Sequence, residues 1–222
     1  TMPVNSRAHG HIRPCQYRHA LPEWLPPSLA GAVATRAVDK GDALFHTGAS
    51  VDLFHFVLRG KLAAVRSMPN GAEAIMLVAR DGEFFAEASL FLPSYTCEAR
   101  ALTTCQIASW PVGLFRQALE RHPDAAMAFA RTLAISLRRQ CSRVERLRLK
   151  LAPDRVLHYL ACETGPSGWT ELPGTVRDWA AELALEPETL YRVLAQLTRA
   201  GKVEREKNRL RLTGACGPVC AR

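Results

Sequence analysis

The sequence lacks a long hydrophobic run, since no stretch approaches the roughly 18 apolar residues of a transmembrane helix. Residues 1–7 also lack the apolar core of a secretory signal. Hydrophobic residues make up 48% and charged residues 23% of the 222 residues. This composition is ordinary for a globular chain and excludes a disordered or membrane-embedded one. We therefore expect a cytoplasmic protein with one or two compact cores and no membrane partner.

The seven cysteines also lack a Cys-x-x-Cys motif, and the spacing of Cys216 and Cys220 is too loose for a confident zinc site without matching partners. An odd number of scattered cysteines without an export signal favours reduced thiols. We predict no metal site. Residues 1–20 have no periodicity and predict a flexible or draped arm, which holds one cluster that could bind haem or a metal: His9, His11, Cys15 and His19.

Positive charge is concentrated in the second half of the chain. The net formal charge is +8, of which residues 1–120 carry +1 and residues 121–222 carry +7. A basic half joined to a near-neutral half suggests a module that binds a polyanion. The alternative is a set of solvated arginines that bind no partner.

Residues 29–110 consist of short apolar runs separated by glycine-containing turns. Runs of strand length with turn signals about every 8–12 residues are typical of an antiparallel sandwich, roll or barrel. The periodicity becomes helical after Pro111. Apolar residues then recur at alternating spacings of three and four, a pattern that skips only Arg148: Met127, Ala130, Ala134, Leu137, Cys141, Val144 and Leu151.

That spacing is an a/d seam of the kind found in coiled coils. One apolar seam on a long charged helix needs a partner, and we predict a second copy in a C2 homodimer, with residues 123–151 as the dimerisation helix. A single amphipathic helix that packs on its own domain is the alternative. Cys141 lies on the seam, which makes it a redox candidate together with Cys216 and Cys220.

Residues 175–201 predict a helix-turn-helix. Thr175 and Asp178 form a capping-box pattern at the start of one helix. Pro187 suits the first position of the next helix, and Gly201 suits its end. Basic residues around a turn at 207–208 follow and predict a β-hairpin wing, in which Lys207 and Arg209 would contact DNA phosphates.

Glu188 and Arg192 lie four residues apart on the second helix and share a face. Such a pair often contributes only a few tenths of a kcal/mol to helix stability. On a recognition helix, the same two residues can accept from a cytosine amino group and donate to guanine.

Three passages resemble the Crp/Fnr superfamily of bacterial transcription regulators, over about residues 25–213. Residues 41–62 resemble the glycine-punctuated start of the family's cyclic-nucleotide-binding β-roll. Residues 82–91, GEFFAEASLF, resemble its GxFfGExsLF element. Residues 188–192, ETLYR, resemble its E-x-x-S-R recognition-helix signature, with Tyr191 where serine is common.

The resemblance implies an α+β protein with an antiparallel β-roll (a cupin-like jelly roll), a long dimerisation helix and a C-terminal winged helix-turn-helix domain. The expected parts are an N-terminal arm (1–20), a β-roll sensor domain (21–122), the dimerisation helix (123–151) and the DNA-binding domain (152–222). The partners would be double-stranded DNA, a second copy and, for an activator, RNA polymerase.

The resemblance also implies residue roles. Glu188 and Arg192 would read the G·C pair of a TGA-like half-site, Thr189 and Arg177 would contact the DNA backbone, and Tyr191 would affect a further base. Pro187 stands where the catabolite-activator branch has a base-reading arginine, so the outer half-site should differ from that branch.

The expected effector pocket comprises Glu87, Tyr95, Thr96 and Cys97. Glu87 matches the family's ribose-binding glutamate, but Tyr95 and Thr96 stand where Arg-Ser binds the phosphate. Without that cation a buried phosphodiester would be an unpaired charge, so cyclic nucleotide activation is not expected. Effector-independent binding and sensing of a thiol oxidant, a metal or another small molecule stay open. We predict a protein that is not an enzyme; a cupin-like metalloenzyme using His46 and His55 is a remote alternative.

Overall fold

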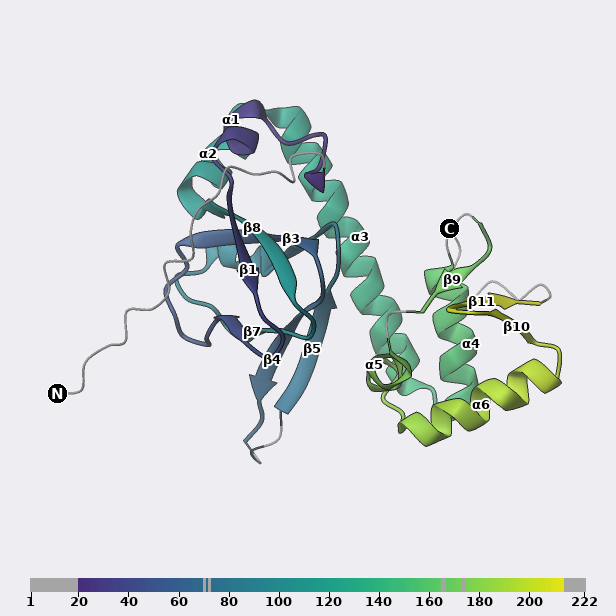
Figure 1. The fold of residues 1–222 in the computed structure, drawn as a ribbon. Coiled ribbons are helices and arrows are strands. Elements are labelled where there is room, and N and C mark those ends of the chain that lie inside the picture. Colours follow the sequence, from purple (N-terminus) through teal and green to yellow (C-terminus); the bar gives the residue numbers. More distant parts are fainter. Residues whose placement is uncertain (1–19, 70, 72, 165–166, 173–174, 214–222) are drawn as a thin grey trace. The chain divides into compact units, whose positions relative to one another are not determined.

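The computed structural model describes residues 20–69, 71, 73–164, 167–172 and 175–213 (Figure 1). The chain divides into two compact units, Thr1–Leu133 and Ala134–Arg222. No helix in the described ranges is long and apolar enough to cross a membrane. Six of the residues singled out above lie outside these ranges: His9, His11, Cys15, His19, Cys216 and Cys220.

The first unit contains two four-stranded sheets in which all paired strands are antiparallel. The first sheet has the order β1 (Ala34–Val38), β8 (Cys105–Pro111), β3 (Leu53–Arg59), β6 (Glu83–Phe85). The second has the order β2 (Ala43–Phe45), β7 (Glu98–Ala101), β4 (Leu62–Ser67), β5 (Glu73–Ala79). The predicted antiparallel roll is confirmed.

Gly60 lies in the turn between β3 and β4. It has a φ of +102°, and a Cβ atom there would lie 2.7 Å from the carbonyl oxygen of Thr104. Only glycine fits this close approach of two backbones without a shift.

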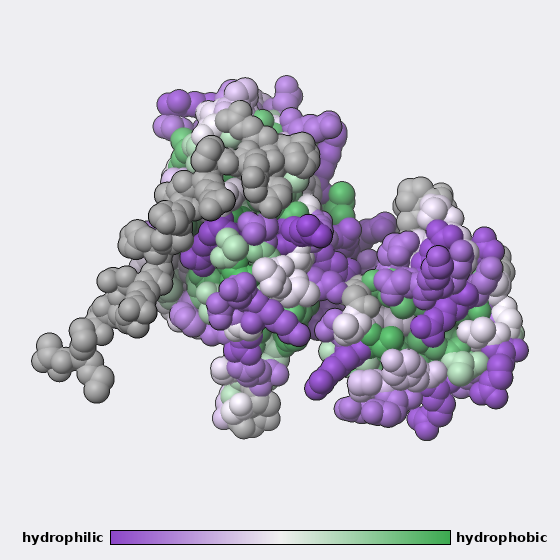
Figure 2. Space-filling view, in the orientation of Figure 1, coloured by the Kyte–Doolittle hydropathy of each residue, from purple (hydrophilic) through white to green (hydrophobic). Residues whose placement is uncertain are grey.

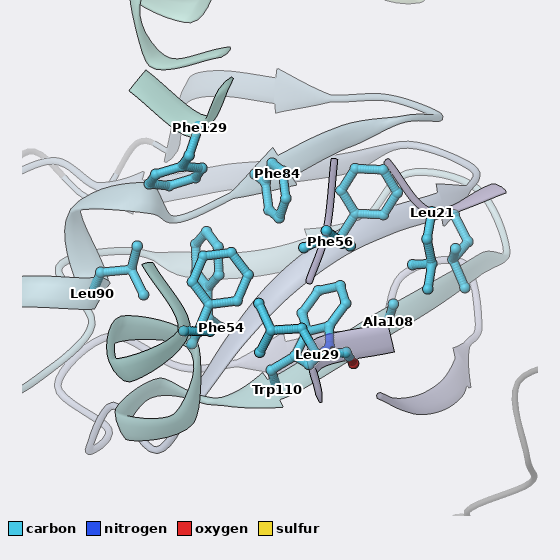
Figure 3. Packing of buried hydrophobic residues seen from close by; sticks show 13 residues of the cluster. Leu21, Leu29, Phe54, Phe56, Phe84, Leu90, Ala108, Trp110 and Phe129 are labelled. Atoms are coloured by element: carbon cyan, nitrogen blue, oxygen red, sulfur yellow. Dashed lines mark hydrogen bonds between the residues drawn. The ribbon is translucent and has the colours of Figure 1, made fainter. Parts of the chain in front are cut away.

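The first sheet is buried on both faces, which explains why β3 is apolar without alternation. Its outer face packs on α1 (Pro27–Gly31), α2 (Val112–Arg121) and the first part of α3 (Pro123–Arg148), and its inner face packs on the second sheet. Figure 3 shows the outer cluster, where Phe84 packs near both Phe54 and Phe129. Trp110 donates from its indole nitrogen to the Leu29 carbonyl over 2.8 Å.

The long helix α3 ends at Arg148, three residues before the predicted boundary at Leu151. Leu151 is extended and precedes α4 (Ala152–Glu163), which has a proline in its first turn. Pro153 has no N–H and its ring would clash with the carbonyl one turn earlier, so α3 cannot continue through it.

The second unit is a helical core with a small three-stranded sheet. Its remaining helices are α5 (Val176–Glu182) and α6 (Pro187–Arg199), and its sheet has the order β10 (Val203–Glu206), β11 (Arg209–Leu212), β9 (Thr170–Glu171). The capping box is present: Thr175 Oγ1 accepts from the Asp178 amide over 3.2 Å, and Asp178 Oδ2 accepts from the Thr175 amide over 3.1 Å. The structure has the predicted α+β fold, but strand β9 was not anticipated.

Candidate DNA-binding surface and sensor interior

Helix α6 has one buried face and one exposed face. Its buried residues are Leu190, Val193, Leu194 and Leu197, which join the core of the second unit. This packing turns Glu188, Tyr191 and Arg192 outward, whereas Thr189 is half-buried. Tyr191 is a large aromatic side chain that is 55% exposed. The described ion pairs include none between Glu188 and Arg192, so both side chains are available to another molecule.

The wing is the antiparallel pair of β10 and β11. Lys207 is exposed at its turn, in the left-handed region with a φ of +48°. Arg209 is half-buried, because it contacts Glu206 over 2.6 Å and lies over the Trp169 ring at 4.6 Å. Its bond to Glu206 raises the pKa of Arg209. Sequence reasoning missed these contacts, which compete with a phosphate for this guanidinium.

A second arginine of the wing is held in the same way. Arg211 pairs with Glu204 and lies 4.8 Å above Trp169. Figure 2 shows hydrophilic side chains over much of the visible face of this unit. Arg177 adds an exposed cation in the first turn of α5.

The predicted seam of α3 is exposed along its length. The side chains of Met127, Leu137 and Val144 are 59%, 66% and 59% exposed. Phe129 and Arg146, on other sides of the helix, are buried within the chain. The seam therefore has no apolar cover among the described residues of its own chain.

In the first unit, Tyr95 is buried inside the roll rather than facing a solvent-filled site. Its hydroxyl donates to the Leu53 carbonyl over 2.6 Å and accepts from His55 Nε2 over 3.2 Å. Its ring stacks on Phe45, with centroids 3.6 Å apart. Burial raises the pKa of Tyr95 to about 12, so the phenol is neutral.

His55 completes this network. Its Nδ1 lies 2.8 Å from the Ser109 hydroxyl. Burial, with a smaller contribution from the charge of Arg36, lowers the pKa of His55 to about 3, so the imidazole is neutral. Because the Tyr95 proton goes to Leu53, Nε2 carries the ring proton and Nδ1 accepts from Ser109.

The other three predicted pocket residues have different environments. Glu87 is half-buried at the start of η2 (Glu87–Phe91), after Ala86 with a φ of +61°. Thr96 is exposed, and its carbonyl accepts from Arg66 over 3.3 Å. Cys97 is half-buried, and burial raises the pKa of its thiol. A raised pKa makes a thiol less reactive, because the thiolate is the nucleophile.

Comparisons with known proteins identify the family. A family model described as "Cyclic nucleotide-binding domain" matches residues 35–122. The cAMP-activated global transcriptional regulator CRP of Pasteurella multocida is 26% identical over 163 residues, which cover 69% of this chain and 78% of that protein. Matches to other CRP sequences cover 44% to 47% of those relatives' length. These matches support a Crp/Fnr superfamily transcription regulator.

Solved structures agree with this membership at the level of the fold. FixK2 from Bradyrhizobium japonicum has a TM-score of 0.65 at 20% identity, over 82% of this chain and 93% of that one. The c-di-GMP responsive global regulator CLP from Xanthomonas campestris has a TM-score of 0.55 at 20% identity, over 84% of this chain and 96% of that one. The CRP relative is described as a transcriptional regulator and CLP as a global regulator.

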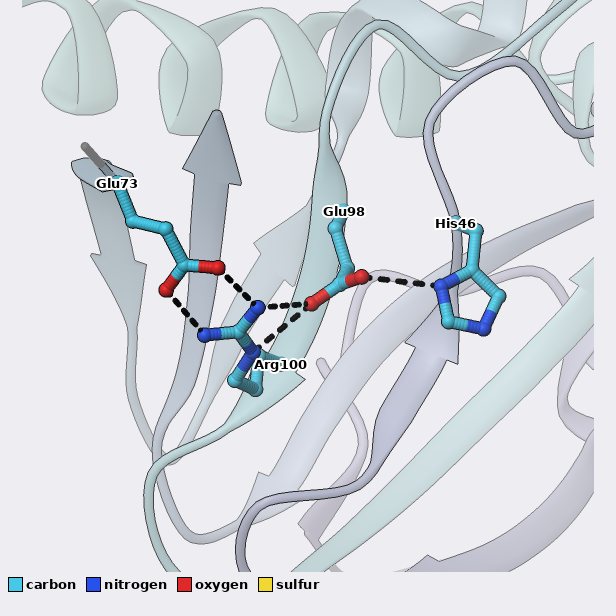
Figure 4. A network of polar contacts seen from close by, with 4 residues as sticks. All are labelled: His46, Glu73, Glu98 and Arg100. Atoms are coloured by element: carbon cyan, nitrogen blue, oxygen red, sulfur yellow. Dashed lines mark hydrogen bonds and ion pairs between the residues drawn. The ribbon is translucent and has the colours of Figure 1, made fainter. Parts of the chain in front are cut away.

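Crp/Fnr proteins that bind cyclic AMP hold its phosphate with an arginine, and the residues here do not fit that role. Tyr95 is neutral and engaged by Leu53 and His55. Arg100, the next basic residue along the chain, lies in the network that Figure 4 shows. It donates to Glu73 over 2.6 and 2.8 Å and to Glu98 over 2.8 Å. Glu98 also contacts His46 over 3.0 Å.

Arg36 on β1 is the cation that sequence reasoning missed in this region. It is half-buried and donates to the Leu44 carbonyl over 2.7 Å. Burial lowers the pKa of Arg36, and the nearby Tyr95 opposes that change. No sequence pattern marks it, because Arg36 is far along the chain from Tyr95, which lies between η2 and β7.

The described cysteines differ from one another. Cys105 is buried and free, Cys97 is half-buried and free, and Cys141 is exposed and free on the seam. The expectation of reduced thiols is wrong for Cys162, which is disulfide-bonded. Among the described residues, no group of three or more His, Cys, Asp or Glu side chains could hold a metal ion.

Proposed function

We propose that this Crp/Fnr protein is a cytoplasmic homodimer that binds a palindromic, TGA-like operator and regulates transcription there. The observation that carries the proposal is the exposed face of α6, where Glu188 and Arg192 stand free of each other while four apolar residues anchor the helix. A carboxylate and a guanidinium on that face have the chemistry to read a C·G pair in the major groove. An activator would also contact RNA polymerase.

The parts around α6 support a phosphate-binding role. Lys207 at the wing turn and Arg177 at the start of α5 are exposed cations of the same unit. Thr189 at the start of α6 would donate to the DNA backbone, and Tyr191 would contact a neighbouring base. We assign Arg209 a smaller share, because Glu206 and Trp169 already hold its guanidinium.

The exposed seam of α3 supports a homodimer. Two copies that pack along residues 124–151 would bury the leucine and valine side chains of both chains and give the two-fold symmetry that a palindrome requires. Cys141 would then face its symmetry mate, and a disulfide would form only if the two Cα atoms approach to roughly 4.4–6.8 Å.

For the effector, we propose that cyclic AMP does not activate this protein. The phosphate would meet the neutral Tyr95 instead of an arginine, and a buried charge without a partner costs several kcal/mol. Binding without an effector, or sensing of an oxidant, a metal or another small molecule, stays open. A cyclic nucleotide response is the second candidate, favoured by the matched domain family and by the half-buried Arg36.

The test is a selection of bound sequences from random duplex DNA, with reduced, oxidised and metal-loaded protein in parallel. We expect a palindrome with a TGA-like half-site. Enrichment of no sequence under any condition would contradict the proposal. A site enriched under one condition alone would identify the signal.

A further inference from the structure

Two arginines of the second unit join the end of α3 to the helix-turn-helix, and neither belongs to the DNA-contacting set. Arg155 on α4 is half-buried and donates to three backbone carbonyls. Its Nε donates to Leu149 over 2.8 Å, and its Nη1 donates to Leu183 over 3.3 Å and to Ala184 over 2.9 Å. Leu149 directly follows α3, whereas Leu183 and Ala184 form the turn between α5 and α6.

This turn needs outside support. Ala184 has a φ of +51°, a left-handed conformation that L residues other than glycine rarely adopt. Carbonyls at the end of a helix have no partner within it, and those of Leu183 and Ala184 both accept from Arg155. A charged donor makes each of these bonds stronger than a neutral one.

Arg146 makes the second connection, from the last turns of α3. Its side chain is 1% exposed, its guanidinium lies 4.6 Å above the Tyr159 ring on α4, and its Nη2 is 3.6 Å from Glu163. Tyr159 in turn meets Trp179 of α5 edge-on, with centroids 5.5 Å apart. Burial lowers the pKa of Arg146, and the charges of Glu163 and Glu182 oppose that change. The buried Nε of Arg146 has no hydrogen-bond partner in the described residues.

Such an arrangement is a poor way to gain stability, since a buried ion pair can often be replaced by apolar side chains without loss. It is a good way to fix orientation, because a planar guanidinium bonds its partners in set directions. Only Leu149, Lys150 and Leu151 separate α3 from α4. The two arginines therefore hold a short joint and the recognition-helix turn together.

We propose that Arg155 and Arg146 are positioning residues that fix the helix-turn-helix on the end of α3 and so determine which half-site spacing the dimer accepts. This inference rests on the proposed function. In a dimer joined along α3, the angle between that helix and α6 sets the separation of the two recognition helices. The centres of the two half-sites must match that separation. Two half-sites on the same side of the duplex lie one helical turn of DNA apart, about 34–36 Å, or a multiple of that distance.

The test compares operators that differ only in the number of base pairs between their half-sites. We expect the full-length wild type to lose about tenfold or more in affinity when one base pair is added or removed. Arg155→Met should reduce this preference to less than about threefold, with binding to a single half-site unchanged, because the base-reading side chains are intact. Arg146→Met should act in the same direction but also lower the melting temperature, because it leaves the Glu163 carboxylate without its cation.

Arg148→Met is the matched control, since it removes the same charge from an exposed position at the end of α3. Arg155→Lys is a second variant in case Arg155→Met does not fold; one ammonium cannot serve both ends of the joint, so we expect it to lose spacing preference as well. Wild-type spacing preference in folded Arg155 variants would overturn the proposal.

Hydrogen exchange of backbone amides, measured without DNA, tests the positioning role independently of the proposed function. The Leu185 amide donates to Ala180 over 2.9 Å within the turn. We expect it to exchange about tenfold faster in Arg155→Met than in Arg148→Met, because the turn carbonyls of Leu183 and Ala184 lose their donor. If the wild type selects no operator, the proposed function fails, and this exchange still decides the positioning role. Equal exchange in the two variants would overturn that role.

Discussion

The two units differ in how closely they match the family pattern at two positions, the phosphate-binding position of the β-roll and the exposed face of α6. In the first unit, the position expected to hold a phosphate-binding arginine is filled by Tyr95, which is neutral, buried and bonded to Leu53 and His55. In the second unit, the recognition helix keeps an exposed glutamate and an exposed arginine. The predicted effector pocket therefore departs from the family pattern, whereas the exposed face of α6 keeps it.

Both units also bury polar groups, but in different ways. The first unit buries a neutral chain of Ser109, His55 and Tyr95, whose donors and acceptors satisfy one another. The second buries the Arg146 guanidinium. A neutral network stabilises a core only if it stays uncharged, which makes the first unit sensitive to acid.

The largest effect should come from the seam of α3 that we propose joins two copies. Leu137→Glu should dissociate the dimer, because it removes two apolar side chains worth about 1.5–3 kcal/mol each and places like charges across the seam. Sedimentation at micromolar concentration measures this. Ser136→Glu, one position away from the seam, is the control and should stay dimeric. A wild type that sediments as a monomer would refute the seam itself.

The next effect concerns the DNA-reading surface. Arg192→Ala should cost roughly 1–3 kcal/mol per half-site and relax preference at one base pair. Arg209→Ala should weaken all sequences alike and lower the salt dependence, and by less, because Glu206 and Trp169 hold this side chain. Competition titrations on the selected operator and on one mutated at the guanine distinguish the two. Equal loss on both operators in Arg192→Ala would make Arg192 a phosphate contact or a helix-stabilising partner of Glu188.

A further effect tests the neutral network of the first unit. The pKa of His55 is about 3 in the folded protein, against an ordinary value of 6.5 in the unfolded chain, so only the unfolded chain takes up a proton between these values. The free energy of unfolding should then fall as pH falls, by about 2 kcal/mol from pH 6.5 to about pH 5. Denaturant unfolding of wild type and His55→Gln measures this slope. The variant should lack it, and an equal slope in both would show that His55 is not the cause.

The last effects compare one buried hydroxyl with one surface cation. Tyr95→Phe keeps the ring on Phe45 but leaves the Leu53 carbonyl and the Nε2 proton of His55 without their partner. We expect a loss of about 1–3 kcal/mol in the free energy of unfolding. Arg100→Met is a comparison within the same unit, where exposed ion pairs should contribute less than about 1 kcal/mol. A neutral Tyr95→Phe would mean that water replaces the lost bonds.

Features of the fold that depend on residues close together in the sequence could be predicted from it. The capping box of Thr175 and Asp178, the turn before Pro187 and the apolar face of α6 are set by neighbours in the sequence, so their pattern indicated them correctly. The end of α3 was misplaced by three residues, because the a/d spacing continues to Leu151 although Pro153 already starts a new helix.

Contacts between distant residues were not predictable in this way. Arg36 and Tyr95 lie on different elements, as do Arg155 and the turn at Ala184, and no spacing rule connects them. The chemistry of the wing was also missed, because Trp169 reaches β11 only through the unexpected strand β9. A basic residue in a sequence does not reveal which carboxylate or ring already holds it.

The difference between a retained DNA-reading surface and an altered sensor is tested most directly by one titration. Wild-type protein is titrated with the selected operator and with its guanine-mutated form, each with and without millimolar cyclic AMP. We expect about tenfold or greater preference for the selected operator and no change on adding cyclic AMP. No preference between the two operators would contradict the DNA-reading role of α6, and a tenfold gain with cyclic AMP would show that another cation, such as Arg36 or Arg100, reaches the ligand.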